Sequence, residues 1–137
     1  MSTIIRPELS QKNKYWIERH RYYELKHFCL QYNSWKKSIE ALEGFSKRPV
    51  NMEFIPSYIS DPTARTAMAK LFYSNRLRMV EQVCRETDEE LAPYILKGVT
   101  QGASYDTLNA KIAIPCCKDV YYDTYRKFFW LLDKARK

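Results

Sequence analysis

The sequence predicts an all-α protein. Its 137 residues include only three glycines and six prolines, too few for the many turns of a β-sandwich or a nucleotide-binding α/β fold. With 45% hydrophobic residues the chain can form one modest core or two very small ones. Aromatic residues make up 15%, which excludes a disordered basic tail. We expect an N-terminal helical hairpin at residues 1–45, a linker or strap at 46–61, and a helical bundle at 62–137 that contains a central helix and a C-terminal helix-turn-helix.

The first segment has apolar residues near a 3.6-residue period. They predict one helix over residues 8–32 and include Tyr15, Tyr22, Leu25, Cys29 and Tyr32. Asn33 or Ser34 can cap a second helix that runs to Leu42, with Gly44 just beyond its end. We expect the second helix to fold back on the first.

Residues 46–61 contain two interior prolines and no helical period, which is typical of a linker or an extended strap. Apolar side chains in this segment predict that it packs: Phe54, Ile55, Tyr58 and Ile59. Asp61 followed by Pro62 predicts a helix start, because the carboxylate accepts from first-turn amides and proline there loses no hydrogen bond. Apolar spacing continues this central helix to about residue 85.

The next helix is expected to begin at Asp88, because acidic residues favour the positive end of the helix dipole. Gly98 stands where a C-cap glycine is expected. Pro93 falls inside the pattern, which indicates a kink or an earlier break.

The last 34 residues have the order of a helix-turn-helix. Ser104 is a good N-cap for a short helix over residues 105–111, and a longer helix follows over 117–135. Between them stand a small turn residue, an apolar plug and a helix stop: Ala113, Ile114 and Pro115. The longer helix has an apolar stripe expected to dock on the shorter one and on the helix around residues 95–99: Tyr121, Tyr125, Phe128 and Leu132.

The opposite face of the longer helix is polar and supplies candidate DNA contacts. Lys118 and Tyr122 lie in the first turns, from which a recognition helix reads base edges, and are candidates for base or phosphate contacts. Arg126 and Lys127 are candidates for backbone contacts.

Two further pairs complete the candidate interface. Ser104 and Tyr105 stand at the start of the shorter helix, and helix N-termini hold phosphates. Asp119 and Asp123 can accept from a cytosine amino group, or they are ordinary acids that favour the helix dipole. The whole face is either a DNA surface or the solvated face of a plain helical bundle.

Residues 95–134 resemble a known family. The runs ILKGVTQG, SYDTL and IPCCKDVYYDTYRKFFWLL are similar to the C-terminal domain of phage late-gene transcriptional regulators of the RinA and ArpU type, a domain that is similar to region 4 of sigma factors. The run YYELKHFCLQYNSW resembles their opening helices. The resemblance implies a phage- or prophage-encoded activator that binds double-stranded promoter DNA in the bacterial host cell, with host RNA polymerase as a further candidate partner.

Two departures from that family change what the resemblance implies. The turn IPCCKDV is one residue longer than the usual sigma-like spacing, which affects the base-reading positions. After Asp123, where a run of arginines is expected, Thr124 and Tyr125 precede Arg126. This predicts a weaker grip on phosphates.

The net charge of +7 points to a polyanionic partner. Basic residues outnumber acidic ones by ten to five in residues 1–50 and by seven to four in 100–137, but not in 51–99. Basic and aromatic residues alternate in the first helix. They can contact nucleic acid, serve oligomerisation such as a homodimer, contact polymerase, or simply form an amphipathic helix.

Other kinds of site have less support. No stretch approaches the roughly 20 apolar residues of a membrane span, and the first nine residues are too polar for a signal peptide, so we expect a cytoplasmic protein with no membrane partner. His20 and His27 lack further ligands for a metal. Cys116 and Cys117 stand near a helix start, where a thiol pKa falls, and are either reactive or simply part of a DNA-facing turn.

No set of nucleophile, base and orienting group can be assigned, so we expect no enzyme and no cofactor. Three functions stay open: a transcription activator, another phage DNA-binding module such as a small packaging subunit, and a non-catalytic protein-interaction module with the same fold. The first two predict DNA binding whose log affinity falls with log salt by about 0.9 per phosphate contacted.

Overall fold

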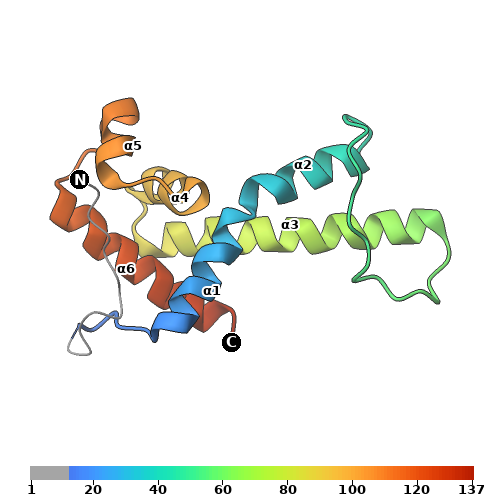
Figure 1. The fold of residues 1–137 in the computed structure, drawn as a ribbon, viewed down its shortest axis with the longest axis horizontal. Helices are drawn as coiled ribbons and strands as arrows, with labels where there is room; N and C mark the ends of the chain where they lie inside the picture. Colours follow the sequence, from blue (N-terminus) through green and yellow to red (C-terminus); the bar gives the residue numbers. More distant parts are fainter. Residues whose placement is uncertain (1–12) are drawn as a thin grey trace. The chain divides into compact units, whose positions relative to one another are not determined.

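In the computed structural model, which describes residues 13–137, the described chain forms six α-helices and no strand (Figure 1). The all-α prediction is confirmed. The helices are α1 (Arg19–Leu30), α2 (Tyr32–Leu42), α3 (Pro62–Thr87), α4 (Ala92–Gln101), α5 (Tyr105–Ile112) and α6 (Lys118–Ala135). Among these residues, no helix combines the length and apolar character needed to cross a bilayer.

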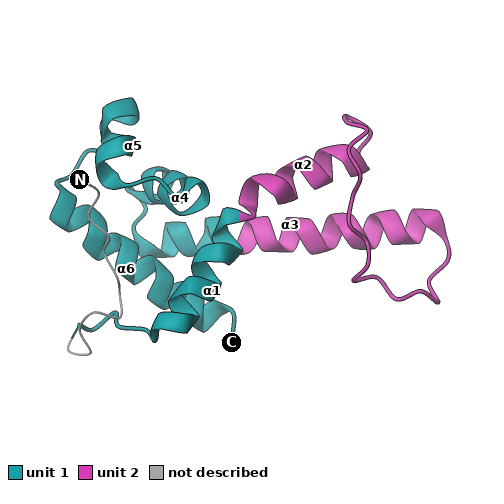
Figure 2. Ribbon diagram, in the orientation of Figure 1, with its two compact units in different colours: residues 1–30, 80–137 teal, residues 31–79 magenta. Residues whose placement is uncertain are grey.

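The chain divides into two compact units (Figure 2). Among the described residues, unit 1 comprises 13–30 and 80–137, and unit 2 comprises 31–79, so the boundary falls within α3. The predicted division differs, because α1 belongs to unit 1 and α2 to unit 2. Only Gln31 separates these helices, whereas an αα-hairpin uses a loop of about 2–5 residues. The two helices predicted for the N-terminal hairpin therefore fall in different compact units.

The first helix begins later than the sequence pattern predicts. Asn13 Oδ1 accepts a hydrogen bond from the Tyr15 amide at 2.8 Å, which forms a local turn in place of a helical one. Glu18 Oε2 accepts from the Arg21 amide at 3.1 Å and so caps the helix that starts at residue 19. The predicted residues 8–12 of this helix lie outside the described part of the chain.

Unit 1 is a bundle in which α1 packs against α4 and α6, and α4, α5 and α6 pack against one another. Its core contains Leu25, Cys29, Val80, Ile95, Leu108, Phe128, Phe129 and Leu132, which are all almost completely buried. Tyr121, Phe128 and Leu132 confirm the apolar stripe predicted on the C-terminal helix, and Tyr125 is half-buried. Trp130 packs edge-on against the Tyr15 ring.

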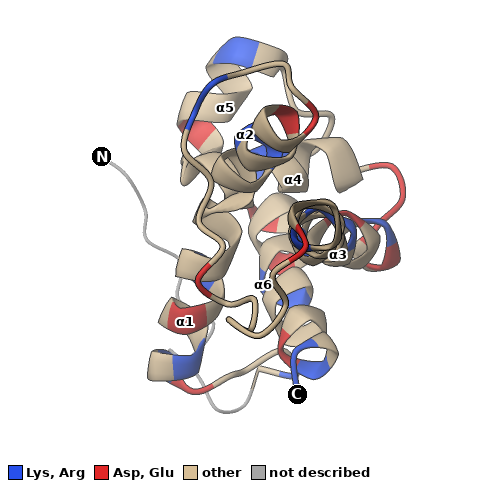
Figure 3. Ribbon diagram, turned by 90° about the vertical axis from the view of Figure 1, so that its right-hand side faces the viewer, with Lys and Arg blue, Asp and Glu red and all other residues tan. Residues whose placement is uncertain are grey.

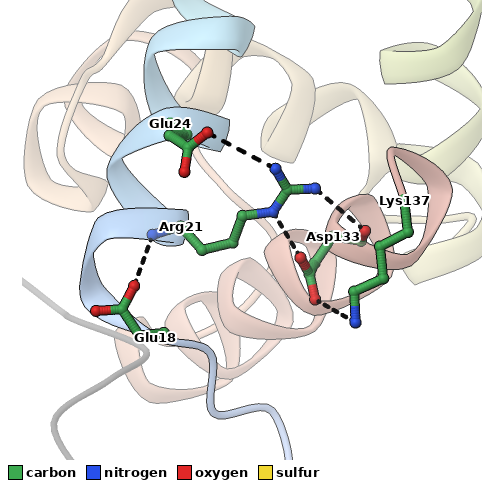
Figure 4. Close-up of polar contacts among 5 residues, drawn as sticks. All are labelled: Glu18, Arg21, Glu24, Asp133 and Lys137. Atoms are coloured by element: carbon green, nitrogen blue, oxygen red, sulfur yellow. Dashed lines mark hydrogen bonds and ion pairs between the residues drawn. The ribbon is translucent and has the colours of Figure 1, made fainter.

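A polar network joins α1 to the end of α6 (Figure 4). Arg21 Nε donates to Asp133 Oδ1 at 2.7 Å, and both side chains are largely buried. The other Asp133 oxygen lies 3.6 Å from Lys137 Nζ, and Arg21 also lies 3.9 Å from Glu24. Charge-assisted hydrogen bonds of this kind fix orientation, so α6 is held at its C-terminal end by the first helix.

In unit 2 the strap packs on α3. Ile55 is buried as the sequence predicts, whereas Tyr58, which is also expected to pack, is 83% exposed. The Phe54 ring stacks on the Phe72 ring at 3.9 Å between centroids. The Tyr73 hydroxyl donates to the Asn51 carbonyl at 2.7 Å, and Arg65 donates to the Ile59 carbonyl at 2.8 Å. These bonds satisfy strap carbonyls that a segment without regular structure leaves open.

Of the two N-caps predicted for the helices of unit 2, one is confirmed. Asp61 Oδ1 accepts from the Thr63 amide at 3.1 Å and caps α3. Capping of α2 by Asn33 or Ser34 is wrong, because α2 begins at residue 32 without a capping side chain. Its end is predicted correctly, with Gly44 at φ +86°.

In unit 1, α4 differs from its prediction at both ends. Asp88 Oδ1 accepts from the Leu91 amide at 3.0 Å, and the helix begins only at residue 92, with Pro93 in its first turn. The predicted break at the proline is therefore the helix start. The C-cap is Gly102, at φ +68°, and not Gly98, which is buried inside the helix.

Candidate nucleic-acid interface

The interface is built on α5, residues 113–117 and α6, and both helices lie where the sequence predicts them. Ser104 Oγ accepts from the Thr107 amide at 3.3 Å and caps α5. Ala113 adopts φ +48° at the turn, and Ile114 is buried beneath it. The Ile114 amide donates to Asn109 Oδ1 at 2.9 Å, which ties the turn back to α5.

Tyr122 does not lie on the polar face where the sequence places it. Its side chain is only 7% exposed, and its hydroxyl accepts from the Tyr105 amide at 3.0 Å. The Tyr105 hydroxyl in turn donates to the Cys116 carbonyl at 2.6 Å. Both tyrosines therefore hold the turn and the start of α6 in place, and both hydroxyls are hydrogen-bonded within the protein.

Lys118 is tied to α5 as well. Its Nζ lies 2.9 Å from Asp106 Oδ2, and this hydrogen bond raises the pKa of Lys118. The pair is partly exposed, so it contributes little to stability, but the Asp106 carboxylate offsets the charge of the first basic residue of α6. Spacing alone identifies Lys118 and cannot show a partner twelve residues earlier.

The first two turns of α6 leave Asp119, Asp123 and Val120 exposed. Val120 is 48% exposed, and the sequence reasoning missed it. Val120 stands three residues before Asp123 and seven before Lys127, so helical spacing puts it on the polar face. An apolar β-branched residue on that face is the sequence feature that could have identified it. Apolar side chains that reach the major groove can contact thymine methyl groups, and carboxylates can accept from cytosine amino groups.

Arg126 and Lys127 follow in the third turn and are half-buried. Within residues 13–137 neither side chain forms an ion pair or a hydrogen bond. Their cationic groups are therefore available to an outside anion. Basic and acidic residues are interspersed along α6 (Figure 3).

The start of α6 adds a second anion-binding feature. Its N-cap is Cys117, which makes no side-chain capping hydrogen bond within the described chain. First-turn amides without a capping side chain favour a phosphate, because they carry the positive end of the helix dipole. The first-turn amides on one side, and Arg126 and Lys127 on the other, can therefore hold phosphates that flank the exposed first two turns of α6.

Comparison with known proteins adds no family to this geometry. No family model, no curated protein and no solved structure matches the chain. The function has to be inferred from the interface itself.

The four thiols are expected to differ in reactivity. Burial raises the pKa of Cys84 from 9.0 to about 12 and raises that of Cys29, and it also raises the pKa of Cys116. Cys117 is exposed at the start of α6. Because the thiolate is the nucleophile, iodoacetamide at pH 8 should alkylate Cys117 first and Cys29 and Cys84 only after unfolding, as followed by peptide mass mapping. Equal labelling rates in the native protein would contradict the buried positions.

Proposed function

We propose that this chain is a phage or prophage DNA-binding transcriptional regulator, a late-gene activator, that contacts promoter DNA through α6. The observation that carries the proposal is the arrangement of α6 itself. Its first turns are fixed against α5 by the Tyr105–Tyr122 and Lys118–Asp106 hydrogen bonds. A rigid helix with an exposed N-terminal face is what major-groove reading requires.

The roles of the site residues follow from their positions. Asp119, Val120 and Asp123 would face base edges, and Arg126 and Lys127 would hold phosphates. Ser104, Tyr105 and Tyr122 act as positioning residues. Ser104 caps α5, and the two tyrosines join the start of α5 to α6 and to the turn. On this proposal the protein is not an enzyme, needs no cofactor and acts in the cytoplasm of the bacterial host. Host RNA polymerase and a second copy of the chain are further candidate partners.

One observation favours a second candidate, a protein-interaction module without DNA. The exposed part of the α5–α6 face carries Asp106, Asp119 and Asp123. The basic residue in the first turn of α6, Lys118, is paired with Asp106. The acidic residues in the first two turns of α6 would repel phosphates there and would suit a basic protein surface. This charge distribution makes a direct test of DNA binding necessary.

Selection of bound fragments from random and phage-genomic DNA tests the proposal. A regulator should enrich a defined sequence, with cytosine and thymine at the positions that Asp119, Val120 and Asp123 face. Enrichment without a shared sequence would indicate a nonspecific DNA-binding module such as a packaging subunit, which should also form a ring in light scattering. No enrichment at low salt would favour the protein-interaction module and overturn the proposal.

A further inference from the structure

Unit 2 contains a pocket of about 610 Å³ that the proposed DNA contacts do not use. One face of α2, the strap and the second half of α3 within this unit line it, through residues that include Ser34, Ser38, Arg48, Glu53, Phe72 and Arg76. The volume lies within the range of about 300–1,000 Å³ typical of small-molecule sites. The lining is more polar than that of most such pockets, which points to a charged ligand.

Arg76 is held firmly in the wall of this pocket. Its guanidinium lies over the Phe72 ring at 4.3 Å and over the Trp35 ring at 5.9 Å from the ring centroids. The Phe72 ring is also stacked on the Phe54 ring, with 3.9 Å between the ring centroids. A guanidinium fixed over rings loses little side-chain entropy when it binds, and its planar donors match a phosphate in two parallel hydrogen bonds.

Two charges on the strap complete the pocket. Arg48 and Glu53 are exposed, and within the described chain neither side chain forms an ion pair. Burial lowers the pKa of Arg76, but an arginine keeps its charge at neutral pH. The charged residues among the described lining are two arginines and one glutamate, which is a formal excess of one positive charge.

We propose that this pocket binds the phosphate of a nucleotide, with Arg76 and Arg48 as the phosphate ligands and the exposed ring of Phe54 beside the base. Serine hydroxyls at 34 and 38 offer further donors to phosphate oxygens. Stacking on an aromatic ring accepts any base, so the site is not selective for one nucleotide. The nucleotide comes either from solution or from an unpaired strand of DNA or RNA.

Titration calorimetry on the full chain tests this site. Adenosine 5′-monophosphate should bind at least about tenfold more tightly than adenosine, because two charge-assisted hydrogen bonds are added. The variants Arg48→Gln and Glu53→Gln change only exposed strap residues. The first should weaken binding several-fold, and the second should tighten it, since it removes the one acid in the pocket. Arg76→Gln should weaken binding by about tenfold or more.

The matched control is Arg78→Gln, which changes an exposed charge on the same helix outside the pocket and should leave affinity unchanged. Competition with a single-stranded oligonucleotide separates the two sources. Displacement of the mononucleotide by a tighter oligonucleotide would assign the site to a strand, and its absence would assign it to free nucleotide. Adenosine binding as tightly as its phosphate, or equal affinities in the Arg48→Gln and Glu53→Gln variants, would overturn the proposal. So would no binding at millimolar nucleotide.

Discussion

The variant Gly98→Ala should lower the free energy of unfolding by about 2 kcal/mol, although alanine is favoured over glycine in a helix by about 1 kcal/mol. Gly98 lies inside α4, and a methyl group there would overlap the Tyr121 hydroxyl and approach Leu108 Cδ1 to 3.3 Å. Tyr121 is 1% exposed and cannot move aside without disturbing the core. Chemical denaturation with circular dichroism measures the change.

A double-mutant cycle identifies the cause of that loss. The Tyr121 hydroxyl has no hydrogen-bond partner among the described residues, so Tyr121→Phe should be neutral or stabilising. Combined with Gly98→Ala it should restore most of the lost stability, because the oxygen that meets the new methyl is gone. As a matched control, Tyr125→Phe removes a hydroxyl that is hydrogen-bonded to Tyr22 at 2.9 Å and should not rescue. Equal rescue by both tyrosine variants would show that the overlap is not the cause.

Gly98 also shows where sequence reasoning reaches its limit. A glycine near the end of a helical pattern predicts a C-cap, and Gly102, four residues later, fills that role. What distinguishes the two is the neighbour that each one meets. Tyr121 lies 23 positions away in the sequence, and local periodicity carries no information about such a contact. The same applies to Asp106, whose pairing with Lys118 changes the charge of the interface.

The helices themselves were predictable because they depend on local features. Apolar spacing predicted α3 and α6, and Asp61 and Ser104 cap as expected. The position of Tyr122 was predicted wrongly because a tyrosine fits either face of an amphipathic helix. Its burial depends on the hydrogen bond from the Tyr105 amide, which the spacing along α6 does not show. The predicted division into units differs from the observed one for a related reason. An apolar stripe indicates that a face is buried, and not which helix covers it.

Removing the charges of Arg126 and Lys127 is the decisive test of the proposed DNA interface. The double variant Arg126→Gln, Lys127→Gln keeps most of the half-buried stems and removes both charges. If each charge holds one phosphate, the slope of log affinity against log salt should fall by about 1.8, and affinity at 0.15 M salt by roughly thirtyfold. Fluorescence anisotropy on a selected DNA fragment, repeated at several salt concentrations, gives both values.

The loss must come from phosphate contacts and not from total charge. Arg85→Gln with Lys97→Gln removes the same charge from exposed positions of α3 and α4 and should leave the slope almost unchanged. Sequence preference gives a second criterion, because phosphate contacts carry no base information: the α6 double variant should bind all fragments more weakly in equal proportion. An unchanged slope in the α6 variant would place the DNA elsewhere on the protein. Because Asp123 and Asp119 stand one and two turns earlier on the same helix, that result would favour the acidic face of α6 as a surface for a basic protein.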